Sequence, residues 1–446
     1  MPGNADLKDC KNHLNIRGMI YLMNGISIEV VFAIFGGIIL IGYIGELLSK
    51  RFSIPSALLL LVIGYLLKAS GYVDTTWLGG VQGIFGTLAL IVLLFDGGLS
   101  LGIREVIFKS GRVFVMSVLI TLVSIAGAAA IMGFFGFDPL VGAIIGAIAG
   151  GIGSTTTISV IKGLNLPEGI SRFLTLESSI TDVFSIVITI VLTQSLLAGY
   201  LDIQMIGQGI VGTFSVGALI GIAGAVLFIS VFPKIDKGYG YMVMLGVILA
   251  LYSITEFLGG SGAIGVLIFG IMLGNEKSVR SIIHMDETEE KVPIKEFHTE
   301  VSFIVRTFFF VFLGMVVTLT SINNFTVAVS LMAFFMVARY ALTYLVTRKS
   351  EYAYFKEIIS VVNPRGLATA VLATYPLIAM QNYLQKNGIE NSKELLASLG
   401  NLPEIAFDII VISIIATTIL VPIIWNRQTK TKNNEEKNRK DEKEKP

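Results

Sequence analysis

One apolar stretch of this sequence carries an acidic residue with hydroxyls at helical spacing. Between residues 170 and 197, Ser178, Asp182 and Ser185 lie at positions i, i+4 and i+7, which places them on one face of a helix. The stripe offers one carboxylate and two hydroxyls, which are hard oxygen ligands of the kind that suit Na⁺ and K⁺. Because burial disfavours the charged form of a carboxylate, Asp182 is expected to hold a proton when empty and to release it when a cation arrives. The pattern predicts a site that a cation and a proton share.

Other charged residues in apolar stretches need partners of opposite charge. Glu177 is five residues from Asp182, so it points away from that stripe and is expected to have a different role. Arg365 needs an acidic partner, and we predict a structural ion pair between Glu177 and Arg365. The alternative for Asp182 is that it pairs permanently with an arginine.

Four further intramembrane charges have less defined roles. We expect Arg306 to modulate the site by pairing with Asp182, Asp96 or Asp408. Asp96 is expected to coordinate the cation or to attract cations into a funnel that opens to the cytoplasm, with a structural role as the alternative. Arg339 and Asp408 are interpreted as structural because no hydroxyl cluster lies beside them.

Two stretches contain residues that interrupt a helix. Residues 150–153 read Gly-Gly-Ile-Gly and precede a run of hydroxyls, and residues 363–366 read Asn-Pro-Arg-Gly. Irregular backbone at membrane depth is tolerated where it lines a cavity or is buried in protein. Two broken helices therefore predict the binding site. The alternatives are close helix packing for the glycines and a simple kink for the proline.

The composition identifies the elements that must position these residues. Hydrophobic residues make up 54% of the 446 residues and charged residues 15%, against about 25% charged in soluble domains. A membrane core about 30 Å thick needs roughly 20 apolar helical residues. We find about thirteen such runs, at 26–48, 54–70, 78–100, 112–135, 139–161, 170–197, 206–231, 240–257, 260–275, 299–320, 325–346, 356–384 and 402–425. The chain is predicted to be an all-α polytopic membrane protein.

Basic residues alternate between successive loops, which predicts the orientation in a plasma membrane. They follow the odd-numbered runs, at Lys50, Arg51, Arg104, Lys109, Arg112, Lys162, Lys234, Lys237, Lys277, Arg280, Lys291, Lys295, Arg348, Lys349 and Lys356. We expect an extracellular segment at 1–25, a transmembrane domain at 26–425 and a disordered, charged cytoplasmic tail at 426–446. Mild exceptions are Lys386 and Lys393, which fall on the outer side.

The chain shows a weak internal repeat. Runs three, five and six match runs ten, twelve and thirteen in their Phe and Gly motifs, their breaks, and the acidic residues Asp182 and Asp408. An offset of seven runs inverts the second copy in the membrane, as in many secondary transporters. The sequence thus predicts an inverted repeat.

Four motifs in order resemble those of the monovalent cation:proton antiporter superfamily, the sodium/proton exchangers. They are the Glu177–Asp182 segment, the Arg306–Gly314 segment, Asn363-Pro364-Arg365-Gly366, and Phe95-Asp96-Gly97-Gly98. The resemblance implies thirteen helices with crossed broken helices, a homodimer in membrane lipid, Asp182 as carrier, and an ion pair between Glu177 and Arg365.

Two positions depart from the resemblance. Thr181 stands where the family often has Asn before the carrier, and Ile152-Gly153-Ser154 replaces a motif with a second carboxylate. Thr155, Thr156 and main-chain carbonyls would then supply ligands. The choice among Na⁺, K⁺ and Li⁺ stays open, and a single carrier carboxylate favours electroneutral exchange.

The sequence offers no sign of an enzyme. It has one cysteine, three histidines outside the apolar runs, and no Gly-rich nucleotide loop, so no cofactor and no nucleic-acid partner are expected. The favoured interpretation is a transporter that exchanges Na⁺ or K⁺ for H⁺ by alternating access. The alternatives are a sodium-coupled symporter of an organic anion and a channel-like or sensory membrane protein.

Overall fold

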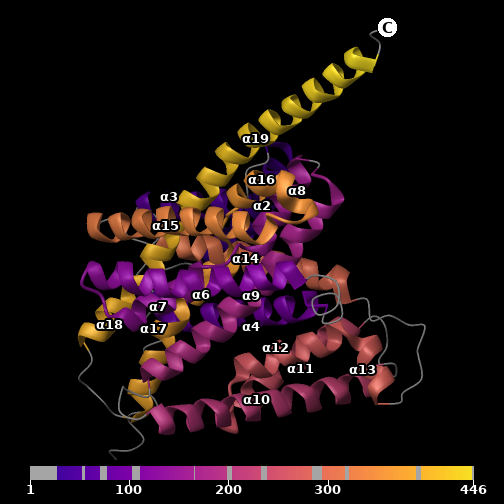
Figure 1. Ribbon diagram of the computed structural model, residues 1–446. Coiled ribbons are helices and arrows are strands. Elements are labelled where there is room, and N and C mark those ends of the chain that lie inside the picture. Colours follow the sequence, from indigo (N-terminus) through magenta and orange to yellow (C-terminus); the bar gives the residue numbers. More distant parts are fainter. Residues whose placement is uncertain are drawn as a thin grey trace, which may run out of the picture.

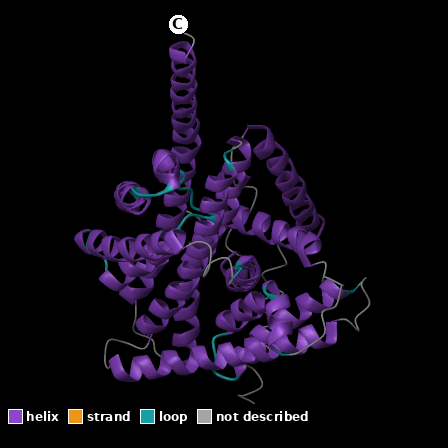
Figure 2. Cartoon of the chain, turned by 45° about the vertical axis from the view of Figure 1, so that its right-hand side comes forward, coloured by secondary structure: helices purple, strands orange, loops and turns teal. Residues whose placement is uncertain are grey.

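The computed structural model describes most of the chain as helix. The described residues are 28–52, 56–70, 78–102, 111–164, 166–197, 203–232, 239–283, 294–316, 321–387 and 393–443. Helices connected by short loops make up these ranges, and no strand occurs within them (Figure 2). The all-α prediction is confirmed. The predicted extracellular segment at 1–25 lies outside the described residues.

The first half of the chain contains seven described helices. They are α2 (Ile28–Phe52), α3 (Ser56–Ala69), α4 (Leu78–Ser100), α6 (Gly111–Phe134), α7 (Pro139–Ala149), α8 (Ser154–Leu164) and α9 (Glu168–Leu197). The second half holds the others: α10 (Ile203–Val231), α11 (Gly240–Phe257), α12 (Gly262–Gly274), α13 (Glu276–Ile282), α14 (Ile294–Val316), α15 (Ile322–Thr347), η2 (Glu351–Phe355), α16 (Lys356–Val361), α17 (Leu367–Asn387), α18 (Lys393–Gly400) and α19 (Leu402–Lys443). Every predicted apolar run coincides with one of these helices or with a broken pair.

Both predicted breaks are present. The run 139–161 divides into α7 and α8 around the glycine-rich residues 150–153, and the run 356–384 divides into α16 and α17 around residues 362–366. Glycine lowers helix stability, and proline removes a backbone donor. The helices end where these residues begin, as expected.

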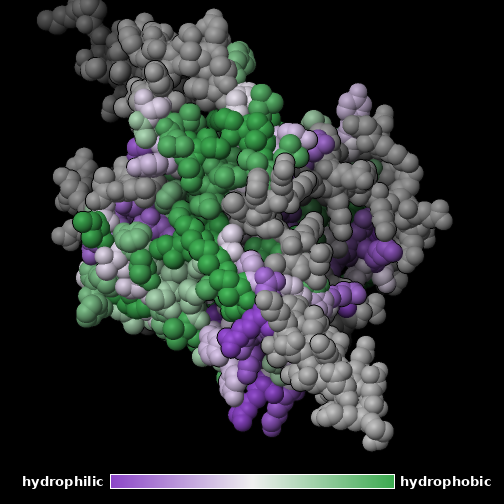
Figure 3. All heavy atoms as spheres, turned by 90° about the horizontal axis from the view of Figure 1, so that it is seen from above, coloured by the Kyte–Doolittle hydropathy of each residue, from purple (hydrophilic) through white to green (hydrophobic). Residues whose placement is uncertain are grey.

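Length and hydropathy mark the chain as one that crosses a membrane repeatedly. Among the described residues, five helices are each long and apolar enough to span a bilayer, and the bent pair α12–α13 raises the number to six. Shorter apolar helices accompany them. Large hydrophobic side chains such as Leu40, Leu219 and Val337 are more than half exposed, and Figure 3 shows a broad hydrophobic surface. The count of about thirteen spans stays a prediction.

Close helix pairs form where glycine faces backbone. A Cβ on Gly98 of α4 would lie 2.5 Å from the Leu267 carbonyl oxygen of α12, and one on Gly64 of α3 would lie 2.1 Å from the Val311 oxygen of α14. Only glycine permits such approaches. In Figure 1, α10, α11 and α12 form a layer beside α4, while α6, α7 and α9 lie with α15 and α17. The site lies among α4, α7, α8, α9 and α17.

Two C-terminal segments differ from the prediction. Helix α18 occupies part of the predicted loop at 385–401, and α19 continues to Lys443 where a disordered tail was expected from residue 426 (Figure 1). The tail is rich in Lys, Glu and Arg, which have high helix propensity, and Glu435 and Glu436 precede Arg439 and Lys440 by four residues. A preceding apolar helix also removes the cost of nucleation.

Candidate functional site

The two helix breaks touch each other. The Gly153 N–H donates to the Pro364 carbonyl oxygen at 2.9 Å, and the Arg365 Nη1 donates to the Gly151 carbonyl oxygen. A Cβ on Gly153 would lie 2.7 Å from the Gly366 nitrogen. Each break therefore supplies hydrogen-bond partners for polar groups of the other. The close contact leaves no room for a side chain at position 153, so glycine is required there.

Asp182 lies beside this contact. Its side chain is buried, with 8% of the residue exposed, and its Oδ2 accepts a hydrogen bond from the Ser154 N–H at 3.2 Å. Ser154 is the first residue of α8, so the carboxylate lies at the positive end of a helix dipole. No arginine or lysine of the described chain lies within ion-pair distance of Asp182. The alternative of a permanent pair with arginine is wrong for this structure.

The hydroxyls predicted to serve the cation site donate to backbone oxygens. Ser178 Oγ donates to the Thr175 carbonyl oxygen at 2.9 Å, and Thr156 Oγ1 donates to the Arg365 oxygen at 3.5 Å. Thr181 Oγ1 donates to the Glu177 oxygen at 3.0 Å. Each hydroxyl oxygen keeps lone pairs that could accept a hydrogen bond or coordinate a cation. The predicted ligand Thr155 lies on α8, but its side chain is outside the described residues.

Asp96 approaches the site from α4. Its residue is half-buried, and its negative charge acts on Asp182. A Cβ on the adjacent Gly97 would lie 3.9 Å from Val183 and 3.8 Å from Ile186. Gly97 is adjacent to Asp96, and Val183 is adjacent to Asp182, so α4 and α9 pack together next to both carboxylates. A second acidic group therefore lies near Asp182.

The partner predicted for Glu177 is wrong. Glu177 is fully buried and forms a two-pronged ion pair with Arg339 of α15: Nη1 to Oε1 is 2.6 Å, and Nη2 to Oε2 is 3.0 Å. Arg339 also donates from Nε and Nη2 to the Ile359 carbonyl oxygen of α16. A guanidinium matches a carboxylate in this geometry. The pair therefore ties α9, α15 and α16 together.

Arg365 has different contacts. Besides Gly151, its guanidinium carbon lies 5.4 Å from the centre of the Phe335 ring, and its backbone N–H donates to Ser413 Oγ at 2.9 Å. Its Nε has no hydrogen-bond partner within the described structure. Arg365 holds the two breaks together through backbone, and it forms no ion pair with Glu177.

The partners predicted for Arg306 are also not observed. Arg306 of α14 is half-buried, and it forms no ion pair with Asp96, Asp182 or Asp408, all of which are described. α14 packs closely against α3 through Gly64 and Gly314. A modulatory role for Arg306 remains a prediction.

A polar cavity of about 310 Å³ opens near the C-terminal end of α9. Gln194, Tyr252, Glu256 and Asn382 are among its lining residues. Asp182 is not, and at 1.5 Å per residue Gln194 is about 18 Å along α9 from it. The residues described contain no cluster of three or more metal-ligating side chains.

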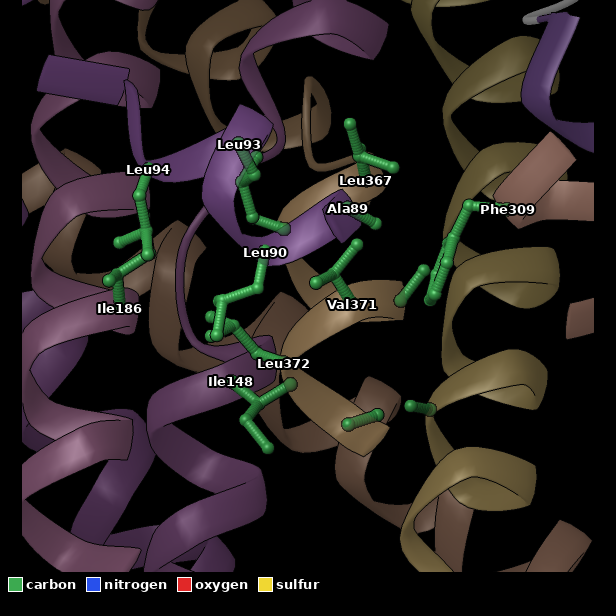
Figure 4. Close-up of a cluster of buried hydrophobic side chains, with 14 of the residues drawn as sticks. Ala89, Leu90, Leu93, Leu94, Ile148, Ile186, Phe309, Leu367, Val371 and Leu372 are labelled. Carbon is green, nitrogen blue, oxygen red and sulfur yellow. The ribbon is translucent and has the colours of Figure 1, made fainter. Parts of the chain in front are cut away.

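A hydrophobic cluster adjoins this cavity. Figure 4 shows Leu90 and Leu94 of α4 gathered with Ile186 of α9 and Val371 of α17. Leu90 and Val371 also line the cavity. Ile186 lies between Asp182 and Gln194 in the sequence of α9. Apolar side chains of α4, α9 and α17 thus pack together beside the cavity.

Two helices that break at a shared contact, beside a buried carboxylate in a chain of many apolar helices, are an arrangement typical of secondary transporters. The chain belongs to the sodium/hydrogen exchanger family, whose model, described as "Sodium/hydrogen exchanger, transmembrane", matches residues 36–426.

Solved structures agree with the fold. The sodium proton antiporter MjNhaP1 from Methanocaldococcus jannaschii at pH 8 superposes with a TM-score of 0.71 and 20% identity, covering 88% of this chain and 100% of that one. This likeness shows that the fold is shared. It confirms the predicted sodium/proton antiporter fold.

Sequence relatives carry names with two different cations. The K(+)/H(+) antiporter NhaP2 of Shewanella sp. strain ANA-3 is 25% identical over 349 residues, 74% of this chain and 58% of that protein. The K(+)/H(+) antiporter NhaP of Alkalimonas amylolytica is 26% identical over 56% of this chain and 45% of its own length. The Na(+)/H(+) antiporter ApNhaP of Aphanothece halophytica is 26% identical over 58% of this chain and 49% of its own. The matched region spans about half the length of these antiporters.

Proposed function

We propose that this chain exchanges Na⁺ or K⁺ for H⁺ across a membrane, with Asp182 as the group that carries each in turn. The observation that supports this most is the setting of Asp182: it is buried, forms no ion pair with a described lysine or arginine, and accepts hydrogen bonds from Ser154 at the start of α8. A buried carboxylate without a fixed counterion must bind a proton or a cation to be neutralised. A proton and a cation cannot both occupy the Asp182 carboxylate at the same time.

The surrounding oxygens complete the proposed cation site. Ser178, Thr156 and the carbonyls at the α7–α8 break offer oxygen ligands, while Asp96 adds a second negative charge nearby. Thr181 anchors the preceding turn of α9 against Gly151. Thr155 belongs to the proposed set through its position on α8. One carrier carboxylate gives one proton per cation, and hence electroneutral exchange.

Alternating access would come from motion of the break-containing helices against the α10–α12 layer. The cluster around Leu90, Ile186 and Val371 adjoins the polar cavity, and under this proposal it closes a route from the cavity to Asp182. If this route opened while the route from Asp182 to the other side of the membrane closed, the bound ion would be carried across the membrane. The proposed arrangement is a homodimer in a plasma membrane, with the N-terminus outside and the basic loops and C-terminus in the cytoplasm.

Proteoliposomes test the proposal directly. With an acid interior reported by a pH-sensitive dye, external Na⁺, K⁺ and Li⁺ are added in separate runs. We expect at least one cation to dissipate the pH gradient, at a rate that an imposed membrane potential does not change. Asp182→Asn should abolish the response, whereas the matched control Glu168→Gln, an exposed position on the same helix, should retain it. A response that survives Asp182→Asn would sink the carrier assignment.

One observation favours a second candidate, the sodium-coupled symporter of an organic anion. Arg365 lacks the acidic partner predicted for it, and its Nε is buried without a hydrogen-bond partner. An organic carboxylate would be recognised by such a guanidinium. Arg365 is, however, only 1% exposed in this conformation. Under symport, cation uptake would require the organic anion and would leave the pH gradient in place, whereas exchange would dissipate the gradient without the anion.

A further inference from the structure

A second polar cavity lies where α6, α9 and η2 meet. Its volume is about 320 Å³, and the polar side chains that line it are Arg112, Arg172, Glu351 and Tyr352. Arg112 is the second residue of α6, and Arg172 lies in the second turn of α9. The cavity is therefore built at the basic-loop end of these helices, away from Asp182 and the helix breaks.

The balance of charge at this cavity favours an anion. Two guanidinium groups line it against one carboxylate. Arg112 Nη2 also donates to the Lys349 carbonyl oxygen at 3.4 Å, which brings the basic pair Arg348 and Lys349 to the same corner. Burial and the adjacent Glu351 carboxylate, to which the phenol hydrogen-bonds, raise the pKa of Tyr352. The two guanidinium groups are suitable donors for phosphate oxygens.

An apolar groove continues directly from the polar cavity. Its volume is about 330 Å³, and Val115 and Leu119 of α6 form its wall with Leu345 and Val346 of α15. The groove shares Gly111 and Arg112 with the polar cavity. Val115 is 48% exposed and Leu345 65% exposed, so the groove opens on the outer surface of the protein. The polar cavity and the apolar groove thus meet at Arg112.

The surrounding side chains place this junction at the edge of a bilayer. Tyr344, one residue before Leu345, is 45% exposed, and the Lys356 ammonium lies 4.9 Å from the centre of its ring. Tyrosines and lysines in this setting are typical of the membrane interface. Starting from Arg112, positions 115 and 119 lie one and two turns deeper along α6, toward the bilayer centre.

We propose that the cavity and groove together bind one anionic phospholipid of the leaflet that faces the basic loops. Its phosphate is held by Arg112 and Arg172, and an acyl chain lies in the groove between α6 and α15. A free phosphate would use only the polar half, whereas a zwitterionic lipid would bring its own cation beside the two guanidinium groups. The joined shape and the charge therefore favour an anionic lipid.

Lipid titration of the purified full-length chain in detergent tests this site. Phosphatidylglycerol, phosphatidylcholine with the same acyl chains, and inorganic phosphate are added separately, with the unfolding temperature and native mass spectrometry as readouts. We expect phosphatidylglycerol to bind and to raise the unfolding temperature, phosphatidylcholine to do so less, and phosphate to have no effect. Arg112→Gln and Arg172→Gln should each weaken phosphatidylglycerol binding about fivefold, since a basic residue near an anionic surface contributes about one kcal/mol.

Two further variants distinguish binding at this site from a general effect of surface charge. Lys277→Gln removes an exposed basic residue on α13 and should leave binding unchanged. Leu345→Trp fills the groove at an exposed position, so it should weaken phosphatidylglycerol binding while the lipid-free unfolding temperature stays the same. Equal stabilisation by inorganic phosphate, or equal binding by both arginine variants and the wild type, would overturn the proposal. So would equal binding of the two lipids.

Discussion

Glu177 and Asp182 are two buried carboxylates on one helix, and the structure treats them differently. Glu177 receives two hydrogen bonds from Arg339 and has none of its surface exposed. Asp182, five residues further on, accepts hydrogen bonds from Ser154 at the start of α8 and keeps 8% of its surface exposed. The first has a permanent counterion within the protein. Under the proposed function, the second obtains its neutralising charge from a mobile ion.

The difference shows why spacing along α9 matters. Five residues correspond to about 500° of rotation, so the two carboxylates face different neighbours. Glu177 faces α15 and α16, which it connects through Arg339, and Asp182 faces the start of α8. A single helix thus provides a fixed attachment on one side and the proposed ion site on the other. The following substitutions test that division.

The largest expected effect on transport comes from Asp182→Asn. The amide keeps the size and polarity of the side chain but cannot exchange a proton, so cation-driven proton movement in proteoliposomes should fall to background. Because a buried charge is removed, the unfolding temperature should stay the same or rise. A variant that unfolds instead would show that Asp182 is structural, and the contrast with Glu177 would disappear.

The largest expected effect on stability comes from Arg339→Leu. Removal of one partner leaves a buried, uncompensated Glu177 and should cost about 3–5 kcal/mol of unfolding free energy. The double variant Glu177→Leu/Arg339→Leu should recover much of that loss, because neither charge remains. Thermal unfolding of the two variants in detergent measures both values. Equal stability of the single variant and the wild type would contradict a structural role for the pair.

An intermediate effect is expected from Gly153→Ala. The added methyl group would lie 2.7 Å from the Gly366 nitrogen and 2.9 Å from its Cα, so the two breaks must separate. Overpacking of this kind costs about 1–3 kcal/mol, and the exchange rate should fall severalfold. Gly45→Ala is the matched control, since a Cβ there meets nothing within 4 Å. Equal rates for the two variants would show that the contact does not position the site.

The smallest expected effect comes from Ser178→Ala. Its hydroxyl already donates to the Thr175 carbonyl oxygen, so it can offer the cation only a lone pair. Its removal should raise the cation concentration needed for half-maximal exchange a few-fold while the maximal rate is kept. A complete loss of exchange would mean that Ser178 acts on a par with Asp182.

The sequence predicted the apolar helices and both breaks because these depend on local chemistry. Runs of about 20 apolar residues must be helical in a membrane, and the glycines at 150–153 and Pro364 disfavour helix wherever they occur. Asp182 could be singled out because an unpaired charge in an apolar run is rare. None of these inferences required knowledge of which helices are neighbours.

The ion-pair partners could not be predicted in the same way. Two buried arginines, Arg339 and Arg365, compete for Glu177, and their positions in the sequence are equally compatible with it. The choice depends on how α15 and α17 pack against α9. Because each buried arginine needs a partner, Arg339 could have been considered for Glu177. That requirement alone could not decide between Arg339 and Arg365. Likewise, the Ser154 backbone donor appears only once α8 is placed.

The length of α19 has a mechanical consequence. At 1.5 Å per residue its 42 residues extend about 63 Å, roughly twice the thickness of a bilayer core. Gln428 and Tyr354 exchange side-chain to backbone hydrogen bonds, so the rod is fastened to η2 just before α16 and its break. With Pro422 as a joint, a small tilt near η2 becomes a displacement of many ångströms at Lys443. A fluorophore attached there would report such movements at a distance from the membrane.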